Sequence, residues 1–258
     1  MPFDPGPPGR ALVLLPLLLA LGCAQPDAPA PPGGLAEAVE PGATATPASP
    51  TTPDAPAATD STVTVVFFGD SLTAGYGLAD PDADAYPALV GARLDAAGIP
   101  ATVVNAGSSG ETTAGGLRRV DWILDRTPPD VFVLALGGND GLRGTDVDAM
   151  EANLDGILEK VREAAPEARL VVAGIEALPN YGAGYTERFR AVFPAVAARH
   201  DAALVPFLLD GVAGVAALNQ PDGVHPTAEG QRRLAATVAP TVLAEAQQAA
   251  RDKVRAAG

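Results

Sequence analysis

The chain has 258 residues, a formal net charge of −14, 2 histidines and 1 cysteine. An acidic chain whose only lysines are Lys160 and Lys253 is repelled by nucleic acid and by anionic lipid, so neither is expected as a partner and small, neutral or weakly charged substrates are favoured. A single cysteine excludes an intramolecular disulfide and a thiolate metal cage, so stability has to come from a hydrophobic core.

The chain begins with the features of an export signal. The apolar stretch at residues 11–21 is too short to span a bilayer and ends in small residues. The only cysteine, Cys23, follows Gly22 directly, and residues 19–23 resemble a bacterial lipoprotein box, in which cleavage leaves a lipidated cysteine. We expect a signal peptide at 1–22 and a protein exported to the periplasm or outer face, anchored to the membrane through Cys23. An ordinary cleaved signal is the alternative.

Residues 23–61 are rich in Pro, Ala and Thr and contain almost no large apolar side chains. Such a segment cannot bury enough surface to offset the entropy lost on ordering, so it is expected to be a disordered linker. A single domain is then expected at 62–250, followed by a short tail at 251–258. At about 190 residues this domain is long enough to bury one α/β core.

From residue 63 onward, short β-branched runs alternate with longer amphipathic stretches, the pattern of repeated βαβ units. The strand candidates are almost continuously apolar, as expected of parallel strands that helices cover on both faces. The expected strands are 63–68, 101–105, 131–136, 168–174 and 203–207, and the expected helices are 85–97, 113–126, 146–164, 186–200 and 227–250. The fold class is therefore α/β with a five-stranded parallel sheet.

The first expected strand ends in Gly69-Asp70-Ser71-Leu72. A strand that stops at a glycine and turns sharply can lift the next side chain out of the sheet, where a hydroxyl can reach a substrate. Ser71 is therefore a candidate nucleophile, which requires a base and a group that orients the base. Asp70 is expected to hold the turn by hydrogen bonds.

Polar, glycine-bearing loops also follow the second and third expected strands, at 105–112 and 137–140. The carboxyl ends of parallel strands share one edge of the sheet, so these loops should converge on Ser71. The backbone N–H groups of Ser71 and Gly110, and the side-chain amide of Asn139, are candidate donors to an oxyanion. For Asn139 a turn-forming role is the alternative.

The two histidines differ in their expected positions. His200 ends a helix that leads into the fifth strand, which places it at the opposite edge of the sheet. His225 lies in the loop before the last helix, three residues after Asp222, at a spacing that lets the carboxylate hold one imidazole tautomer. His225 is therefore the candidate base. As metal ligands, Asp222 and His225 lack further partners at a recognisable spacing, so no metal is expected.

Taken in order, Ser71, Gly110, Asn139 and His225 resemble the four sequence blocks of the SGNH, or GDSL-type, serine hydrolases. Residues 137–144 and 178–182 resemble the bacterial acyl-CoA thioesterase I, lysophospholipase L1 and arylesterase group of that family. The resemblance covers residues 63–244. It implies a flavodoxin-like three-layer α/β/α fold and hydrolysis of carboxylic esters or thioesters, without a cofactor, through an acyl-enzyme.

The resemblance also implies the role of each site residue. Ser71 would be the nucleophile, His225 the base and Asp222 its orienting carboxylate. The backbone N–H groups of Ser71 and Gly110, together with Asn139, would form the oxyanion hole. Two residues depart from the pattern of the group: Glu111 stands after the second block, and Glu176 precedes the loop that resembles the acyl-binding loop.

We expect Phe67, Phe68, Phe132 and Trp122 to lie in the core. The expected lining of an acyl groove is Tyr76, Leu78, Leu178, Tyr181 and Tyr185, of which Leu178 and Tyr181 in the acyl-binding loop are the substrate-binding candidates. The preferred function is that of a monomeric esterase for neutral aryl and short-to-medium acyl esters or lysophospholipids, with thioesters as further substrates. A carbohydrate O-deacetylase using the same triad is one alternative, and a non-catalytic binding lipoprotein is the other.

Overall fold

The computed structural model describes residues 62–257. The expected signal peptide at 1–22, Cys23 and the expected linker at 23–61 lie outside the described residues. The described residues contain a five-stranded parallel sheet with the strand order β2-β1-β3-β4-β5. Its strands are β1 (Val63–Gly69), β2 (Ala101–Gly107), β3 (Val131–Ala135), β4 (Arg169–Ala173) and β5 (Ala203–Val205). The prediction of a five-stranded parallel α/β fold is confirmed.

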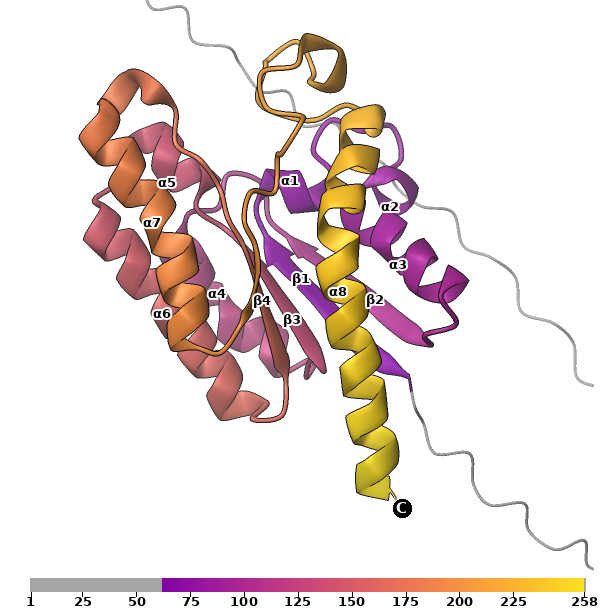
Figure 1. The fold of residues 1–258 in the computed structure, drawn as a ribbon. Helices are drawn as coiled ribbons and strands as arrows, with labels where there is room; N and C mark the ends of the chain where they lie inside the picture. The colour runs from indigo at the N-terminus through magenta and orange to yellow at the C-terminus, as the bar shows by residue number, and fades with distance from the viewer. Residues whose placement is uncertain (1–61, 258) are drawn as a thin grey trace, which may run out of the picture. The chain divides into compact units, whose positions relative to one another are not determined.

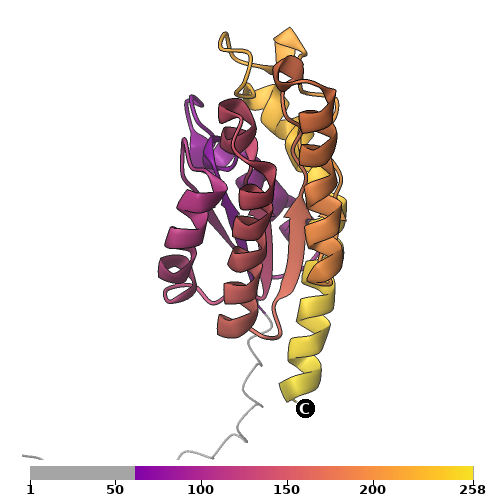
Figure 2. The same ribbon diagram turned by 90° about the vertical axis from the view of Figure 1, so that its left-hand side faces the viewer.

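The helices cover both faces of this sheet, as Figures 1 and 2 show. They are α1 (Ser71–Ala74), α2 (Pro81–Asp84), α3 (Tyr86–Ala96), α4 (Thr113–Leu124), α5 (Gly138–Arg143), α6 (Val147–Ala164), α7 (Ala183–Arg199) and α8 (Ala228–Ala257), with short 3₁₀ turns η1 (Pro179–Tyr181) and η2 (Ala216–Leu218). Helices α3 and α8 pack together on one face, and α4, α6 and α7 lie side by side on the other. The result is the three-layer sandwich that the family resemblance implied.

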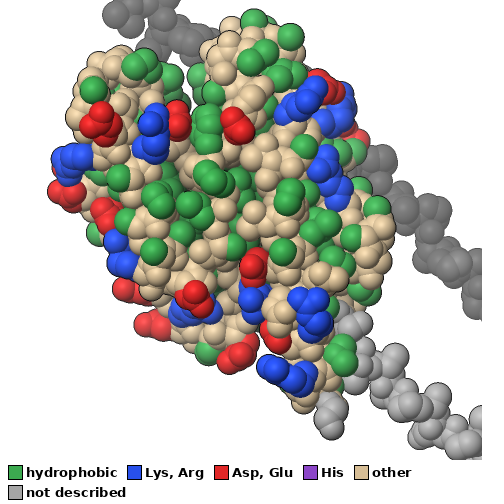
Figure 3. All heavy atoms as spheres, in the orientation of Figure 1, with side chains coloured by type: hydrophobic (Ala, Val, Ile, Leu, Met, Phe, Trp, Pro, Cys, Tyr) green, Lys and Arg blue, Asp and Glu red, His purple; other side chains and the backbone are tan. Residues whose placement is uncertain are grey.

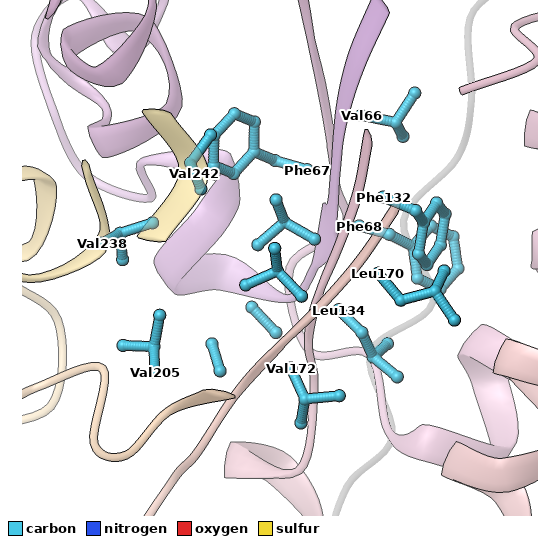
Figure 4. Close-up of a cluster of buried hydrophobic side chains, with 14 of the residues drawn as sticks. Val66, Phe67, Phe68, Phe132, Leu134, Leu170, Val172, Val205, Val238 and Val242 are labelled. Carbon is cyan, nitrogen blue, oxygen red and sulfur yellow. The ribbon is translucent and has the colours of Figure 1, made fainter. Parts of the chain in front are cut away.

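Alternate side chains of the central strands β1, β3 and β4 enter the two halves of the core, which explains why these strands are almost continuously apolar. The ring of Phe67 packs edge-on against Tyr86 of α3, with centroids 5.6 Å apart. Its neighbour Phe68 points to the opposite face and lies 5.5 Å from the ring of Phe132 (Figure 4). These three phenylalanines are buried, as predicted.

Trp122 corrects the prediction for the fourth aromatic residue. It is 55% exposed on α4, and the guanidinium of Arg126 lies 4.1 Å from its ring centroid. The aromatic ring therefore lies on the outer surface, where a cation covers it, because the buried stripe of α4 is formed by other residues, among them Val120 and Ile123.

The strand register brings the chain's polar loops to one edge of the sheet. Gly69, the last residue of β1, pairs with Gly107 of β2 and with Ala135 of β3. The loops after these three strands therefore start at the same level, at the top of the sheet in Figure 1. Two of them hold short helices, α1 and α5, which the sequence patterns did not predict.

The described domain has a core of its own. Within residues 62–257, all the buried core residues fall between Val63 and Ala249, and the compact unit that contains them begins at Asp54. A chain that starts at Asp54 therefore holds the whole core and can fold by itself. Helix α8 continues to Ala257, so residues 251–257 of the expected tail are helical. Among residues 62–257 there is no helix with the length and apolar character needed to cross a membrane.

Candidate active site

Ser71 is presented at the end of β1 by a tight turn. Its neighbour Asp70 is the N-cap of α1, and Ser71 is the first residue of that helix. Only glycine fits at position 69, since a Cβ there would lie 2.0 Å from Oγ1 of Thr73 and 2.8 Å from the carbonyl oxygen of Ala135. The close approach of strand and helix aims the serine hydroxyl over the carboxyl edge of the sheet.

Ser71, His225 and Asp222 form a hydrogen-bonded row. The Oγ of Ser71 lies 2.9 Å from Nε2 of His225, and Nδ1 of His225 lies 2.8 Å from Oδ2 of Asp222. With the imidazole proton on Nδ1 and directed at the carboxylate, Nε2 is free to accept the proton of the serine hydroxyl. The structure thus brings together three residues that are separated by up to 154 positions in the sequence.

The Asp222 carboxylate is held by the turn that it closes. Its Oδ1 accepts the backbone N–H groups of Val224 and His225, at 2.9 and 3.0 Å. The backbone hydrogen bond from His225, followed by the side-chain hydrogen bond from the same residue, lowers the pKa of Asp222 to about 2. The group is therefore an anion throughout the neutral pH range and favours a positive charge on the imidazole.

Two backbone amides and one side-chain amide lie near the serine. Ser71 is the first residue of α1, so its N–H has no acceptor within the helix. Gly110 has a φ of +79° in a turn closed by the N–H of Glu111 and the carbonyl of Ser108, 3.2 Å apart. Asn139 lies in the first turn of α5, and Gly110 and Asn139 line the same cavity as Ser71.

Asp70 forms hydrogen bonds both to the turn that carries Ser71 and to Asn139. Its Oδ1 accepts the backbone N–H of Leu72 at 3.0 Å, and its Oδ2 accepts the side-chain amide of Asn139 at 3.3 Å. The residue is only 2% exposed, and burial raises the pKa of its carboxyl group to about 6. The prediction that Asp70 holds the turn is confirmed, and the structure adds that it orients Asn139.

His200 lies far from this site, as predicted. It follows α7 and precedes β5, at the amino-terminal edge of the sheet. Its Nε2 lies 3.0 Å from Oδ1 of Asp155 on α6. His200 therefore ties two helices together.

A cavity of about 690 Å³ opens beside Ser71. Its wall combines the polar groups described above with apolar residues from the loops after β4 and β5, among them Ile175, Ala177, Leu178, Pro179, Phe207 and Leu209. Within residues 62–257 there is no group of three or more His, Cys, Asp or Glu side chains placed to bind a metal ion.

The predicted acyl-groove residues divide into two sets. Tyr76 and Leu178 line the cavity, whereas Leu78, Tyr181 and Tyr185 do not. The hydroxyl of Tyr181 donates to the carbonyl of Leu142 at 3.0 Å, and that of Tyr185 donates to the carbonyl of Thr145 at 2.9 Å. Tyr181 and Tyr185 thus hold the loop after α5 next to the cavity.

The segments after the last two strands contribute an apolar wall that the sequence patterns did not predict. Ile175 follows β4, and Phe207 and Leu209 follow β5. The rule that predicted the first three loops also applies here, since these segments leave the same edge of the sheet. They were missed because they carry no polar motif.

A parallel α/β sheet with a Ser-His-Asp row at its carboxyl edge defines a hydrolase-type site. The chain belongs to the GDSL-like lipase/acylhydrolase family, whose sequence profile matches residues 67–233. It is therefore an ester-bond hydrolase, and the SGNH resemblance is confirmed.

Several named proteins are similar to this chain in sequence, and one of them is also similar in structure. Esterase TesA of Pseudomonas aeruginosa is 43% identical over 179 residues, which cover 69% of this chain and 87% of the relative. The arylesterase of Vibrio mimicus is 34% identical, with 71% and 90% covered. The thioesterase 1/protease 1/lysophospholipase L1 of Escherichia coli is 37% identical, with 65% and 77% covered. The crystal structure of TesA matches with a TM-score of 0.67 at 42% identity, covering 70% of this chain and 99% of that one.

Proposed function

We propose that this chain is an exported, monomeric serine esterase that hydrolyses carboxylic esters through an acyl-enzyme on Ser71. Aryl and short-to-medium acyl esters, lysophospholipids and thioesters are the proposed substrates. The observation that carries the proposal is the row from Ser71 through His225 to Asp222 at the edge of an apolar cavity. The relatives named esterase, arylesterase and thioesterase/lysophospholipase support the same substrate class.

In the first half of the reaction, the Oγ of Ser71 attacks the ester carbonyl carbon while Nε2 of His225 takes the hydroxyl proton. The carbonyl oxygen becomes negative and receives hydrogen bonds from the N–H groups of Ser71 and Gly110 and from Asn139. Collapse of this intermediate breaks the bond to the alcohol, which leaves with the proton from His225. Asp222 stabilises the imidazolium in between.

In the second half, water replaces the alcohol. His225 takes a proton from the water as its oxygen attacks the acyl-enzyme, and the same donors receive the negative oxygen. The intermediate then releases the carboxylic acid and returns the proton to Oγ of Ser71.

The shape and lining of the cavity support an acyl chain as the bound part of the substrate. Its volume of about 690 Å³ suits a small organic ligand, and Ile175, Leu178 and Phe207 offer apolar contacts. This lining favours an acyl group over the carbohydrate ester considered as an alternative. The intact contact between Ser71 and His225 favours an enzyme over a binding lipoprotein.

Export and lipid attachment belong to the proposal through residues 1–23 of the sequence. A mature chain that starts at Cys23 with added acyl mass would support both. A mature chain with an unmodified amino terminus would leave the esterase in place and remove the anchor. Mass spectrometry of the purified mature protein measures the difference.

Labelling by a fluorophosphonate probe tests the nucleophile. We expect the wild-type protein to be labelled and Ser71→Ala to be unlabelled. Ser109→Ala is the matched control, because Ser109 lines the same cavity outside the hydrogen-bonded row. Absence of labelling in the wild-type protein, or equal labelling of Ser71→Ala, would overturn the proposal. A panel of esters of graded acyl length, with a lysophospholipid included, then defines the substrate.

A further inference from the structure

Most of the large hydrophobic side chains exposed by residues 62–257 gather around the mouth of the cavity. Six of the eight are Tyr76, Leu142, Leu178, Tyr181, Val215 and Val224, which we call the apolar rim. The other two, Trp122 and Val254, lie on α4 and α8. Single exposed hydrophobic residues are common on protein surfaces, whereas a cluster of them marks an interaction site.

The rim is continuous with the cavity. Tyr76, Leu142, Leu178 and Val224 line it directly. Tyr181 is joined to Leu142 by its hydroxyl, and Val215 follows Gly214 of the cavity wall. The rim residues come from the loops and short helices at the carboxyl edge of the sheet, the upper edge of Figure 1. Hydrophobic side chains show along the upper edge of the same view in Figure 3. A molecule that leaves an apolar phase at the rim therefore meets apolar side chains on its way into the cavity.

The charged residues near the apolar rim indicate which kind of lipid surface the rim can bind. Among the described residues that line the cavity there is no lysine or arginine. Glu176 is bound to Arg190 at 2.9 Å, and Asp222 is bound to His225. Two arginines lie beside this lining: Arg143 donates to the carbonyl of Gly110 at 3.2 Å, and Arg190 binds Glu176. The described lining itself thus holds no basic cluster that would attract anionic head groups, and the net charge of −14 opposes such lipids.

We propose that the apolar rim docks onto the surface of a zwitterionic phospholipid bilayer and that acyl chains pass from this surface into the cavity. The proposal rests on the proposed function, because it takes an acyl chain as the ligand of the cavity. Docking buries the six exposed side chains at the boundary between head groups and acyl chains and so removes their apolar surface from water. The same contact holds the opening beside Ser71 against the lipid.

Binding to vesicles tests docking separately from catalysis. The protein used is the domain that starts at Asp54, which carries the complete core and lacks the apolar stretch at 11–21 and Cys23. It also carries Ser71→Ala, so that lipid is not consumed. We expect this domain to co-sediment with phosphatidylcholine vesicles and its binding to change little with added salt. The rim variant is Leu178→Asp with Val215→Asp, and the control variant is Trp122→Asp with Val254→Asp.

The two variants remove similarly exposed hydrophobic side chains, from the rim in one case and from elsewhere in the other. We expect the rim variant to lose at least about tenfold in its partition constant and the control variant to stay within about twofold of the parent. Equal losses in both variants, or no binding by the parent domain, would overturn docking. Stronger, salt-sensitive binding to phosphatidylglycerol vesicles would overturn the zwitterionic partner. Circular dichroism checks folding, and Leu178→Ser with Val215→Ser replaces the rim variant if that variant unfolds.

Hydrolysis of a soluble ester separates the two possible failures. The same domain with Ser71 intact is assayed on p-nitrophenyl acetate, which needs no lipid surface. If the domain hydrolyses the soluble ester but does not bind vesicles, the docking proposal is overturned and the proposed esterase function stands. Absence of hydrolysis removes the proposed function on which docking rests.

Discussion

Asp70 and Asp222 are two carboxylates of one site whose surroundings shift their pKa values in opposite directions. Asp70 is buried beneath Ser71, and its pKa rises to about 6 because burial penalises the charge. Asp222 lies in the exposed loop before α8, and hydrogen bonds from His225 and Val224 lower its pKa to about 2. The two residues therefore have different properties: Asp222 is an anion at neutral pH beside His225, the proposed base, and Asp70 is a structural group that titrates.

Replacing Asp222 with asparagine tests its orienting role. In Asp222→Asn the amide oxygen can still accept the N–H groups of Val224 and His225, while an NH₂ group replaces the oxygen that faces Nδ1. The imidazole then carries its proton on Nε2, where it cannot accept the proton of Ser71. We expect kcat to fall by at least about a hundredfold and KM to change by less than about threefold. Steady-state kinetics on a soluble ester, with the exposed Asp210→Asn as control, measure both constants.

Asp70→Asn tests the buried carboxyl group through stability. The pKa of Asp70 is raised from 3.8 to about 6, so the folded protein binds this proton more tightly than the unfolded chain does. Its contribution to stability is fully present below about pH 4 and is lost as the pH rises through about 6. Asparagine stays neutral, so the free energy of unfolding of Asp70→Asn should increase relative to wild type between pH 4 and 7, by up to about 3 kcal/mol.

Urea unfolding of both proteins across that pH range measures the difference. Asp210→Asn is again the control, because it removes an exposed carboxylate from the same domain. A difference that stays constant with pH, or one that falls as the pH rises, would contradict a raised pKa for Asp70.

Among the structural elements, the loop before α8 is tied to the loop after α1 through Gln220. The Nε2 of Gln220 donates to the carbonyls of Tyr76 and Pro226, at 2.7 and 3.0 Å, and its backbone N–H donates to the carbonyl of His225 at 2.7 Å. The ring of Tyr76 lies against the imidazole of His225, with centroids 4.6 Å apart. The side chain of Gln220 thus connects the segment that carries His225, the proposed base, with the segment that follows Ser71, the proposed nucleophile.

Gln220→Ala should loosen this connection and misplace His225. We expect kcat to fall by about tenfold, because small displacements of a catalytic group are costly, and KM to change less. Gln220→Glu keeps the length of the side chain but sets an oxygen against two carbonyl oxygens, so it should not restore activity. The rate of fluorophosphonate labelling measures serine reactivity directly. Gln248→Ala on α8 is the control, and equal loss of activity in it would contradict a local role for Gln220.

At the scale of the whole domain, the carboxyl-terminal end of α8 contacts the segments that precede β1 and β3, at the amino-terminal edge of the sheet. The Nζ of Lys253 donates to the carbonyl of Thr62 at 2.8 Å and to Oδ2 of Asp130 at 2.7 Å. Asp130 in turn accepts the N–H of Thr64 at 2.7 Å. Residues 251–257, assigned to a tail from the sequence, therefore hold the start of β1.

Truncation after residue 250 tests this contact. We expect the free energy of unfolding to fall by about 1 to 3 kcal/mol, because Asp130 loses a partly buried charged partner. Truncation after residue 254 keeps Lys253 and should cost less than half as much. Urea unfolding of the domain starting at Asp54 measures both, and equal losses would contradict the role of Lys253, because they would assign the effect to residues 255–258, which both truncations remove.

The amino-acid sequence alone was sufficient to predict the strands and helices whose burial requires a recognisable pattern of apolar residues. The central strands β1, β3 and β4 are apolar because helices cover both faces, and apart from the end of α8 the expected helices lie within a few residues of the observed ones. Short helices such as α1 and α5 could not be predicted, because a helix of one turn has no periodic pattern. The end of α8 was missed because a contact with Asp130, distant in the sequence, stabilises it.

The proximity of Ser71, Asp222 and His225 was likewise predictable, because strand ends share one edge and the spacing from Asp222 to His225 is local. Only the tertiary structure decided what surrounds them. The burial of Asp70, the bridge made by Gln220 and the apolar rim depend on which loops meet in space. They leave no pattern in the sequence, since each is assembled from residues of several loops whose approach is set by the register of the sheet.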